Sequence, residues 1–178
     1  MSTKKPLVGI IMGSDSDLST MAESAAMLDA LGVPHEMVIS SAHRSLPRTL
    51  QFARTAEKKG LEIIIVGAGM AAHLAGVIAA EVTIPVIGIP MATKTLSGMD
   101  SLYSMVQMPS GVPVGTVSIG KAGAINAAIL ATQILGNKYP EYKKKLQSMK
   151  KKMAQEVAKK DIKLQKIGHK KYLEKKVK

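Results

Sequence analysis

The 178-residue sequence contains no cysteine and no tryptophan, and aromatic residues make up only 3% of it. Without cysteine the chain has no disulfide, no thiolate metal ligand and no cysteine nucleophile, and this composition fits a cytosolic protein. No apolar run approaches the roughly 20 residues that a membrane-spanning helix needs. The N-terminal segment also lacks the small-residue cleavage site of a secretory signal. We therefore expect a cytoplasmic protein that makes no membrane contact.

The charge of the sequence is unevenly distributed. The net charge is +12, yet residues 1–137 contain nine Lys or Arg and nine Asp or Glu, whereas residues 138–178 contain sixteen lysines, no arginine and four acids. With 46% apolar residues, the 178-residue chain is long enough for one sizeable core and too short for two ordinary domains. We expect one compact domain over residues 1–137 and a lysine-rich helical extension over residues 138–178.

The extension has the pattern of an amphipathic helix. Its apolar residues recur every three or four positions, with lysines filling the other face; they are Tyr142, Leu146, Met149, Met153 and Val157. This pattern predicts a helix docked on the body with a solvated lysine face. The alternative is a nucleic-acid-binding module that works through the basic tail, but such modules favour arginine and interleaved aromatics, so we expect no nucleic-acid partner.

Short apolar segments alternate with helical patterns along the rest of the chain. Strands are expected at residues 6–12, 33–40, 61–66, 84–89 and 112–117; helices are expected up to Gly32, over about 47–59, after 67–72 and over 121–135. Strands that are apolar on both faces predict a parallel sheet covered on both sides. The fold class is therefore α/β: a doubly wound parallel sheet in a three-layer αβα sandwich of the flavodoxin-like kind, with a C-terminal amphipathic helix.

Three strand-to-helix turns carry the unusual residues, and such folds bind ligands at the carboxyl ends of their strands. The first turn, residues 13–17, offers the hydroxyls of Ser14 and Ser16 and backbone N–H groups at a helix start, a combination that suits a phosphate. Asp17 can accept hydrogen bonds from ribose hydroxyls. The same residue types are also common helix N-caps that need no ligand.

The second turn, residues 41–44, places a histidine beside an arginine. Histidine is the residue type that commonly exchanges a proton near neutral pH and arginine is a fixed cation; the two stand here as His43 and Arg44, with Ser41 two positions before the histidine. This pairing of a titratable group and a fixed cation indicates a turn that can carry chemistry. A solvated surface loop is the alternative.

The third turn, residues 67–74, follows a strand and opens a helix as Gly-x-Gly-x-x-Ala, which partly matches the dinucleotide fingerprint. The fingerprint belongs on the first βα unit and requires an acid at the end of the next strand, where this chain has Ile89 and Pro90. We therefore interpret the turn as one whose small residues let the backbone approach a flat ligand, with His73 just inside the helix. A capping or core role for His73 is the alternative.

Together these turns resemble the N5-carboxyaminoimidazole ribonucleotide mutase family, which carries Met-Gly-Ser-x-Ser-Asp, Ser-Ala-His-Arg and Gly-Ala-Gly-x-Ala-Ala-His-Leu. The resemblance covers residues 6–137 and continues through 96–102, 106–114 and 122–135. Three positions depart from the pattern of many relatives. Met70 replaces a glycine, Ala75 a proline, and Ser110 an arginine or glycine.

The resemblance implies an isomerase that moves a carboxylate between two positions of an aminoimidazole nucleotide in purine biosynthesis, with no cofactor and no metal. It implies that His43 and Ser41 act at the reacting group. Substrate binding falls to the remaining residues of the three turns, namely Ser14, Ser16, Asp17, Arg44, Gly69, Ala71, His73 and Leu74. It also implies a homo-octamer. The alternative within this chemistry is a carboxylase that joins free carbon dioxide to aminoimidazole ribonucleotide.

Overall fold

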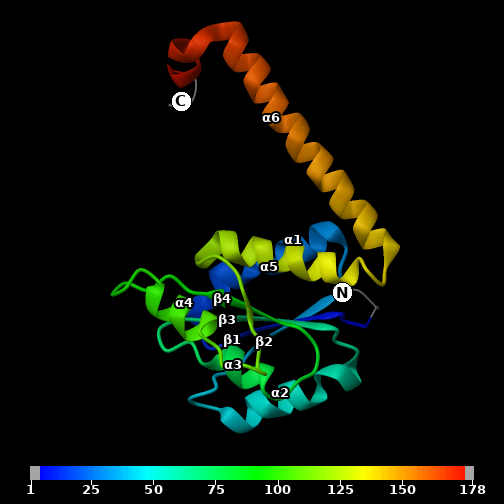
Figure 1. The fold of residues 1–178 in the computed structure, drawn as a ribbon, viewed down its shortest axis with the longest axis vertical. Coiled ribbons are helices and arrows are strands. Elements are labelled where there is room, and N and C mark those ends of the chain that lie inside the picture. Colours follow the sequence, from blue (N-terminus) through cyan, green and yellow to red (C-terminus); the bar gives the residue numbers. More distant parts are fainter. Residues whose placement is uncertain (1–4, 175–178) are drawn as a thin grey trace.

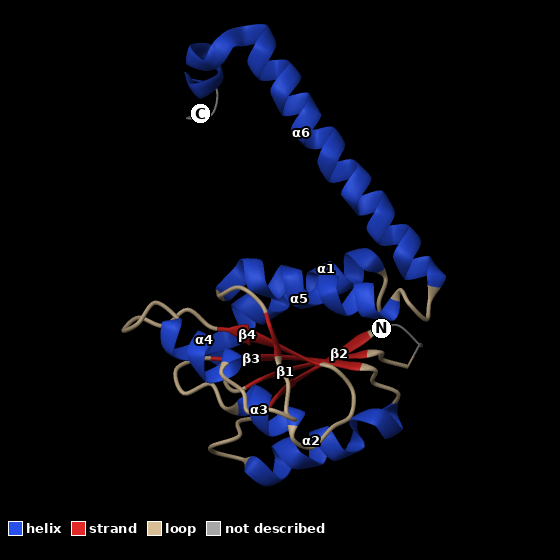
Figure 2. Cartoon of the chain, in the orientation of Figure 1, coloured by secondary structure: helices blue, strands red, loops and turns tan. Residues whose placement is uncertain are grey.

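The computed structural model describes residues 5–174, which form an αβα sandwich with one long helix projecting from it (Figures 1 and 2). The elements follow the order β1 (Val8–Met12), a 3-10 turn (Asp15–Asp17), α1 (Leu18–Leu31), β2 (His35–Ile39), α2 (Leu46–Lys59), β3 (Ile63–Ala68), α3 (Leu74–Ala79), β4 (Val86–Pro90), α4 (Met99–Val106), β5 (Gly115–Thr116), α5 (Gly120–Leu135) and α6 (Pro140–Glu174).

The five strands form one parallel sheet in the order β2-β1-β3-β4-β5. This is the strand order of the flavodoxin-like fold, so the predicted doubly wound sandwich is confirmed. The order reverses next to β1, so the turns that follow β1, β2 and β3 come together at the carboxyl edge of the sheet. That edge is where the three turns with unusual residues were expected to meet.

The three central strands β1, β3 and β4 are buried on both faces because they are apolar at every position. Alternate residues of β3 enter two different cores: Ile63 and Ile65 pack with α1 and α5, whereas Ile64 and Val66 pack with α2 and α3. Figure 2 shows α1 and α5 above the sheet and α2 and α3 below it. Burial of this kind contributes about 1.5–3 kcal/mol for each large aliphatic side chain.

Two elements differ from the sequence prediction. β5 contains only Gly115 and Thr116 instead of the expected residues 112–117, because Pro113 has no N–H to donate and the strand lies at the sheet edge. Helix α4 was not predicted. It is only eight residues long and begins after Ser97 and Gly98, which both have positive φ, so the preceding segment looks like a loop in the sequence.

The extension is helical as predicted, but most of it does not dock on the body. Tyr142 and Leu146 are buried and Met149 is partly buried against the α1 and α5 core. Beyond them Met153 and Val157 are 57% and 65% exposed, so the predicted docking of the whole apolar stripe is wrong. The reason is direction. Figure 1 shows α6 rising obliquely away from the layer formed by α1 and α5, so only its first turns contact that layer.

Candidate functional site

A cavity of about 720 Å³ opens at the carboxyl edge of the sheet. All ten residues that the sequence singled out lie in its lining: Ser14, Ser16, Asp17, Ser41, His43, Arg44, Gly69, Ala71, His73 and Leu74. They come from the turns after β1, β2 and β3, as the strand order requires. The structure therefore brings together every residue predicted for the site.

The first turn is ordered by its own side chains. Ser14 Oγ accepts a hydrogen bond from the backbone N–H of Ser16 (3.3 Å), and Ser16 Oγ donates to the Asp17 carboxylate (3.3 Å). Burial raises the pKa of Asp17 from its usual value, the hydrogen bond from Ser16 opposes this, and the charge of Asp15 adds to it. The carboxylate of Asp17 is thus short of hydrogen-bond donors, which a ligand hydroxyl would supply.

The second turn is anchored from beneath by a hydroxyl network. Ser40, at the end of β2, is buried and shares a hydrogen bond of 2.9 Å with Thr49 of α2. Ser45 Oγ donates to the carbonyl of Ser41 (3.2 Å), and the backbone N–H of Arg44 donates to Ser41 Oγ (3.3 Å). Residues 41–44 are therefore fixed to α2 and direct their longer side chains toward the cavity.

Arg44 links the first two turns. Its Nη2 donates to the carbonyl oxygen of Gly13 at 3.2 Å, across the gap between the ends of β1 and β2. A guanidinium has five N–H donors, so this bond leaves the others available to an anion. Arg44 is thereby held beside the hydroxyls of Ser14 and Ser16, which line the same cavity.

The second and third turns meet through their histidines. His43 Nε2 and His73 Nδ1 lie 2.9 Å apart, with the two rings perpendicular and their centroids 5.1 Å apart. One nitrogen donates and the other accepts, so a single N–H···N hydrogen bond joins the two rings in the lining of the cavity. Sequence reasoning placed both histidines in the site but did not predict that they bond to each other.

The third turn has a constrained backbone. Met70 has a φ of +58°, in the left-handed region that favours glycine, and this explains why the methionine is a departure from the family pattern. A Cβ on Gly69 would lie 3.3 Å from the Cβ of Met91, so the absence of a side chain lets the turn approach the end of β4. Ser104 Oγ of α4 lies 3.4 Å from the carbonyl oxygen of Met70, while its hydroxyl donates to the carbonyl of Asp100 at 2.7 Å.

A fourth wall of the cavity was missed by the sequence reasoning. It consists of the segment after β4, residues 91–96, together with Asp100 at the start of α4. Thr93 Oγ1 donates to the Asp100 carboxylate (2.8 Å) and accepts from the backbone N–H of Gly98 (3.0 Å), which closes the loop on itself. The signal was available, because this loop also follows the carboxyl end of a parallel strand and contains the family motif that begins at Leu96.

Two further features concern the described part of the chain as a whole. Within residues 5–174, no three His, Asp or Glu side chains converge in a way that would hold a metal ion. Over the same residues, no helix combines the length and the apolar character needed to cross a bilayer. The cavity walls present hydroxyls, the bonded histidine pair, the cations Arg44 and Lys94, the carboxylates Asp17 and Asp100, and small residues.

Comparison with known proteins gives this arrangement a context. Residues 7–156 match the AIR carboxylase family. The chain is 54% identical to the N5-carboxyaminoimidazole ribonucleotide mutase of Pyrococcus horikoshii, over 97% of both chains, and 52% identical to that of Thermotoga maritima, over 96% of this chain and 99% of the relative. The crystal structure of Treponema denticola PurE superposes with a TM-score of 0.80 at 29% identity, over 89% of this chain and 98% of that one. Because the match includes all four turns around the cavity, the chain belongs to the AIR carboxylase family.

Proposed function

We propose that the protein converts N5-carboxyaminoimidazole ribonucleotide to 4-carboxyaminoimidazole ribonucleotide in purine biosynthesis. The mutases of Pyrococcus horikoshii and Thermotoga maritima, at more than 50% identity over nearly the whole chain, support this reaction and the isomerase class. The observation that carries the proposal is the bonded pair of His43 and His73. It places a mobile proton in the same cavity as the hydroxyls and the arginine that suit a nucleotide phosphate.

The nucleotide is held by the first two turns. Its phosphate takes hydrogen bonds from Ser14, Ser16 and the free guanidinium donors of Arg44. A ribose hydroxyl donates to Asp17, which adds a second hydrogen bond to the one that the carboxylate accepts from Ser16. The base then lies toward the histidine pair, with Gly69, Ala71 and Leu74 forming a close apolar wall.

The reaction is a decarboxylation followed by a carboxylation. The carbamate C–N bond breaks and releases carbon dioxide, while His43 gives a proton to the departing nitrogen. The ring carbon C4 then attacks that carbon dioxide. The proton on the tetrahedral C4 passes back to the side chain of His43. The proton balance is zero over the cycle. His73 exchanges the proton with His43 between the two steps, and Ser41 lies next to the carboxylate.

Besides proton transfer, the reaction requires that carbon dioxide stay in the cavity. Its escape would leave aminoimidazole ribonucleotide with no carbon dioxide to attack. The third turn, with its small residues, and residues 91–96 from the fourth turn enclose the reacting end of the cavity. The backbone N–H groups of the third turn face a carboxylate product. Enclosure of this kind holds the reactants in contact and excludes water.

The surroundings of the site form part of the same proposal. Residues 1–137 are the catalytic domain and residues 138–178 are an extension that serves stability and assembly. The protein works as a homo-octamer in the cytoplasm and requires neither metal nor organic cofactor. Truncation after Asn137 is expected to reduce stability or assembly more than it reduces the chemical step.

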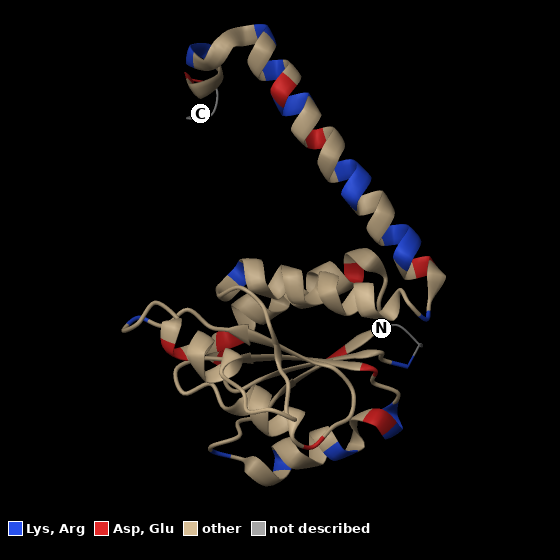
Figure 3. Cartoon of the chain, viewed as in Figure 1, with Lys and Arg blue, Asp and Glu red and all other residues tan. Residues whose placement is uncertain are grey.

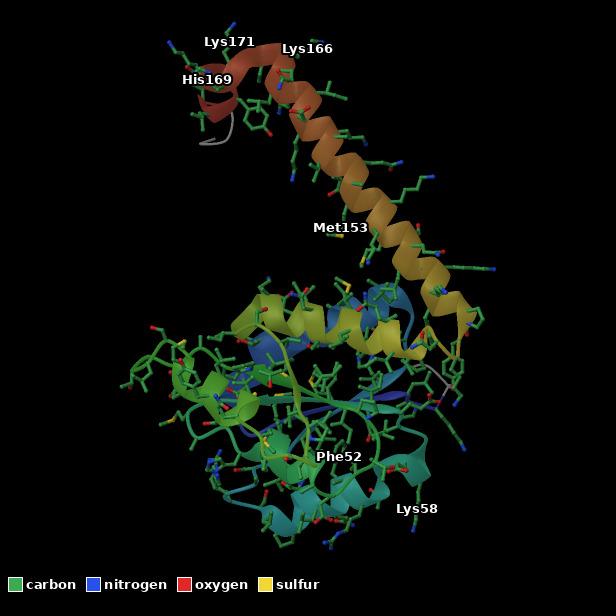
Figure 4. All side chains as sticks on the ribbon, viewed as in Figure 1. Phe52, Lys58, Met153, Lys166, His169 and Lys171 are labelled. Atoms are coloured by element: carbon green, nitrogen blue, oxygen red, sulfur yellow. The ribbon has the colours of Figure 1, made fainter. Side chains whose placement is uncertain are left out.

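The test is an isotope experiment with purified protein in the presence of a chelator. Substrate that carries ¹³C in its carbamate is incubated with excess unlabelled bicarbonate, and the product is followed by NMR. A mutase retains the label in the carboxylate that is attached to C4 of the product. Loss of the label to the bicarbonate pool, or product formed only from aminoimidazole ribonucleotide and bicarbonate, would instead identify the direct carboxylase. For the variant His43→Asn, the matched control is His169→Asn, because His169 lies on α6 away from the cavity of its own chain (Figure 4).

A further inference from the structure

The loop between β4 and α4, residues 91–98, is tied across its base by one side chain. Thr93 Oγ1 donates to the Asp100 carboxylate at 2.8 Å and accepts from the backbone N–H of Gly98 at 3.0 Å. The chain therefore leaves the body at Thr93 and returns at Gly98, and the same hydroxyl holds both points. These two hydrogen bonds are called the Thr93 clasp below.

The tip of the loop packs little against the body. Residues 94–97 are exposed, and the side chain of Leu96 is 55% exposed. The base is tight, because Gly98 has a φ of +90° and a Cβ there would lie 2.8 Å from Ile119 Cγ2 and 3.0 Å from the carbonyl oxygen of Met91. Figure 3 shows the loop extending from the body beside α4. The position of the tip thus depends on hydrogen bonds at the base and not on buried side chains.

The Asp100 carboxylate is stabilised without a ligand. It lies in the first turn of α4, where the positive end of the helix dipole favours an anion, and it accepts the hydrogen bond from Thr93. An aspartate placed in this way anchors the loop, although it also lines the cavity. Asp100 and Thr93 therefore act on a bound molecule through the loop that they hold.

The place of the loop in the row of turns decides what it can cover. The strand order β2-β1-β3-β4 puts the turn after β4 next to the turn that carries His73. Arg44 follows β2, three strands away, which corresponds to about 14 Å at the usual spacing of strands. The loop therefore borders the His73 side of the cavity, where the proposed function places the reacting carbon, and not the phosphate side.

We infer that Thr93 and Asp100 are positioning residues that keep carbon dioxide in the cavity during the reaction; the inference rests on the proposed function. Breakage of the carbamate C–N bond leaves aminoimidazole ribonucleotide, whose nitrogen has taken a proton, and free carbon dioxide. Two routes then compete. Carbon dioxide reacts with C4, or it passes the loop, takes up water and becomes bicarbonate and a proton. The Thr93 clasp slows the second route because it keeps residues 94–96 in the cavity wall.

The test compares full-length variants in which the clasp is broken, kept or untouched. Thr93→Val has nearly the same shape and makes neither hydrogen bond, whereas Thr93→Ser keeps the hydroxyl. Thr83→Val is the matched control, because Thr83 Oγ1 also donates to a carboxylate, that of Glu57 at 2.9 Å, but lies before β4 at the amino edge of the sheet.

Each variant receives substrate with ¹³C in its carbamate and excess unlabelled bicarbonate. Aminoimidazole ribonucleotide and labelled product are then measured per substrate consumed, and a blank without protein corrects for spontaneous loss of the carbamate. Thr93→Val is expected to release aminoimidazole ribonucleotide about 10- to 100-fold more often per turnover than the unmodified chain, the factor that corresponds to one lost hydrogen bond to a charged group. The rate of substrate consumption should change much less, because the carbamate bond still breaks.

The other variants order the effect. Thr93→Ser and Thr83→Val are expected to retain the label as the unmodified chain does. Asp100→Asn keeps an acceptor but removes the charge, so it should release an intermediate amount, and it carries the test if Thr93→Val does not fold. The double variant Thr93→Val/Asp100→Asn should release no more than Thr93→Val, since the two side chains act through one bond.

Three results would overturn the inference while the unmodified chain retains its label. They are equal release by Thr93→Val and Thr83→Val, equal release by Thr93→Val and Thr93→Ser, and slower consumption by Thr93→Val without added release, which is the behaviour of a merely structural residue. If Asp100→Asn has to carry the test, release equal to that of the unmodified chain overturns it. Loss of the label by the unmodified chain is a separate outcome, because it contradicts the proposed mutase reaction and this inference with it.

Discussion

The carboxyl edge of the sheet is fixed in place by local hydrogen bonds, whereas most of helix α6 is not fixed by contacts with the body. At the edge, short turns are fixed by hydrogen bonds over a few residues, such as Ser45 on Ser41 and Thr93 on Asp100, and their functional side chains remain free for a ligand. In α6 only the first turns are fixed, and the rest of a long helix has neither core nor ligand. Local hydrogen bonds therefore hold a site in place before a ligand binds. The position of an apolar helix face, in contrast, is fixed only where another surface packs on it.

The largest effect is expected at the edge, from His43→Asn. An amide cannot carry the proton, so turnover at saturating substrate should fall by roughly 100- to 10,000-fold while nucleotide binding changes little. Steady-state kinetics with a direct binding measurement separates the two quantities. Near-normal turnover in this variant would mean that another residue carries the proton, with His73 as the next candidate.

Arg44→Ala provides the contrast to His43→Asn within the same turn. The loss of a charge-assisted contact to phosphate should raise KM by about 10- to 100-fold and leave the saturated rate much closer to normal. The two variants thus have opposite kinetic signatures. If Arg44→Ala were slow at saturation and bound nucleotide normally, the assignment of its side chain to phosphate would be wrong.

Leu146→Ala and Met153→Ala compare the packed first turns of α6 with its projecting part. Leu146 is buried against α1 and α5, so its truncation should lower the free energy of unfolding by about 2–5 kcal/mol. In protein dilute enough for the subunits to dissociate, Met153→Ala should change the free energy of unfolding by less than about 0.5 kcal/mol. Urea unfolding measures both. Equal losses would mean that the projecting part of the helix packs on its own body.

Met70→Gly tests the strain in the third turn. The left-handed conformation costs a non-glycine residue roughly 1 kcal/mol, and the Met70 side chain is 70% exposed and loses little packing. The variant should therefore gain up to about 1 kcal/mol of stability, less the added freedom of glycine in the unfolded chain. Thr95→Gly, in an exposed loop with ordinary φ, is the control and should lose stability. If Met70→Gly also lost stability, backbone strain at Met70 would not be the dominant contribution to the effect of the substitution.

The smallest effect concerns the attachment of α6 to the body. Burial alone would raise the pKa of Glu62, but hydrogen bonds from Lys138 and Tyr139 and the charge of Lys138 lower it below its usual value of 4.5. A lowered carboxyl pKa stabilises the fold above the unfolded pKa, and this contribution disappears as the pH falls through the folded one. Glu62→Gln should therefore cost about 0.2–1 kcal/mol at neutral pH. The difference from the unmodified chain should vanish well below pH 4.5, which thermal unfolding at several pH values can follow.

Much of the fold follows from local pattern. Apolar strands, the helix ends at Gly32 and Gly60, and the turns with His43 and His73 were all predicted, because hydrophobic period and turn chemistry act over a few residues. The prediction failed where an element is short or depends on its surroundings. Helix α4 is hidden by the turn at Ser97 and Gly98, and β5 is shortened by Pro113.

By itself the sequence determined the parallel sheet, the catalytic side chains proposed at its carboxyl edge and the lysine-rich helix, since each is encoded by neighbouring residues. Only the tertiary structure decided that His43 bonds to His73, that residues 91–96 complete the cavity, and that α6 leaves the body after Met149. These facts depend on distances between segments that are far apart in the chain. The strand order and the lengths of the packed helices set those distances, and no local pattern records them.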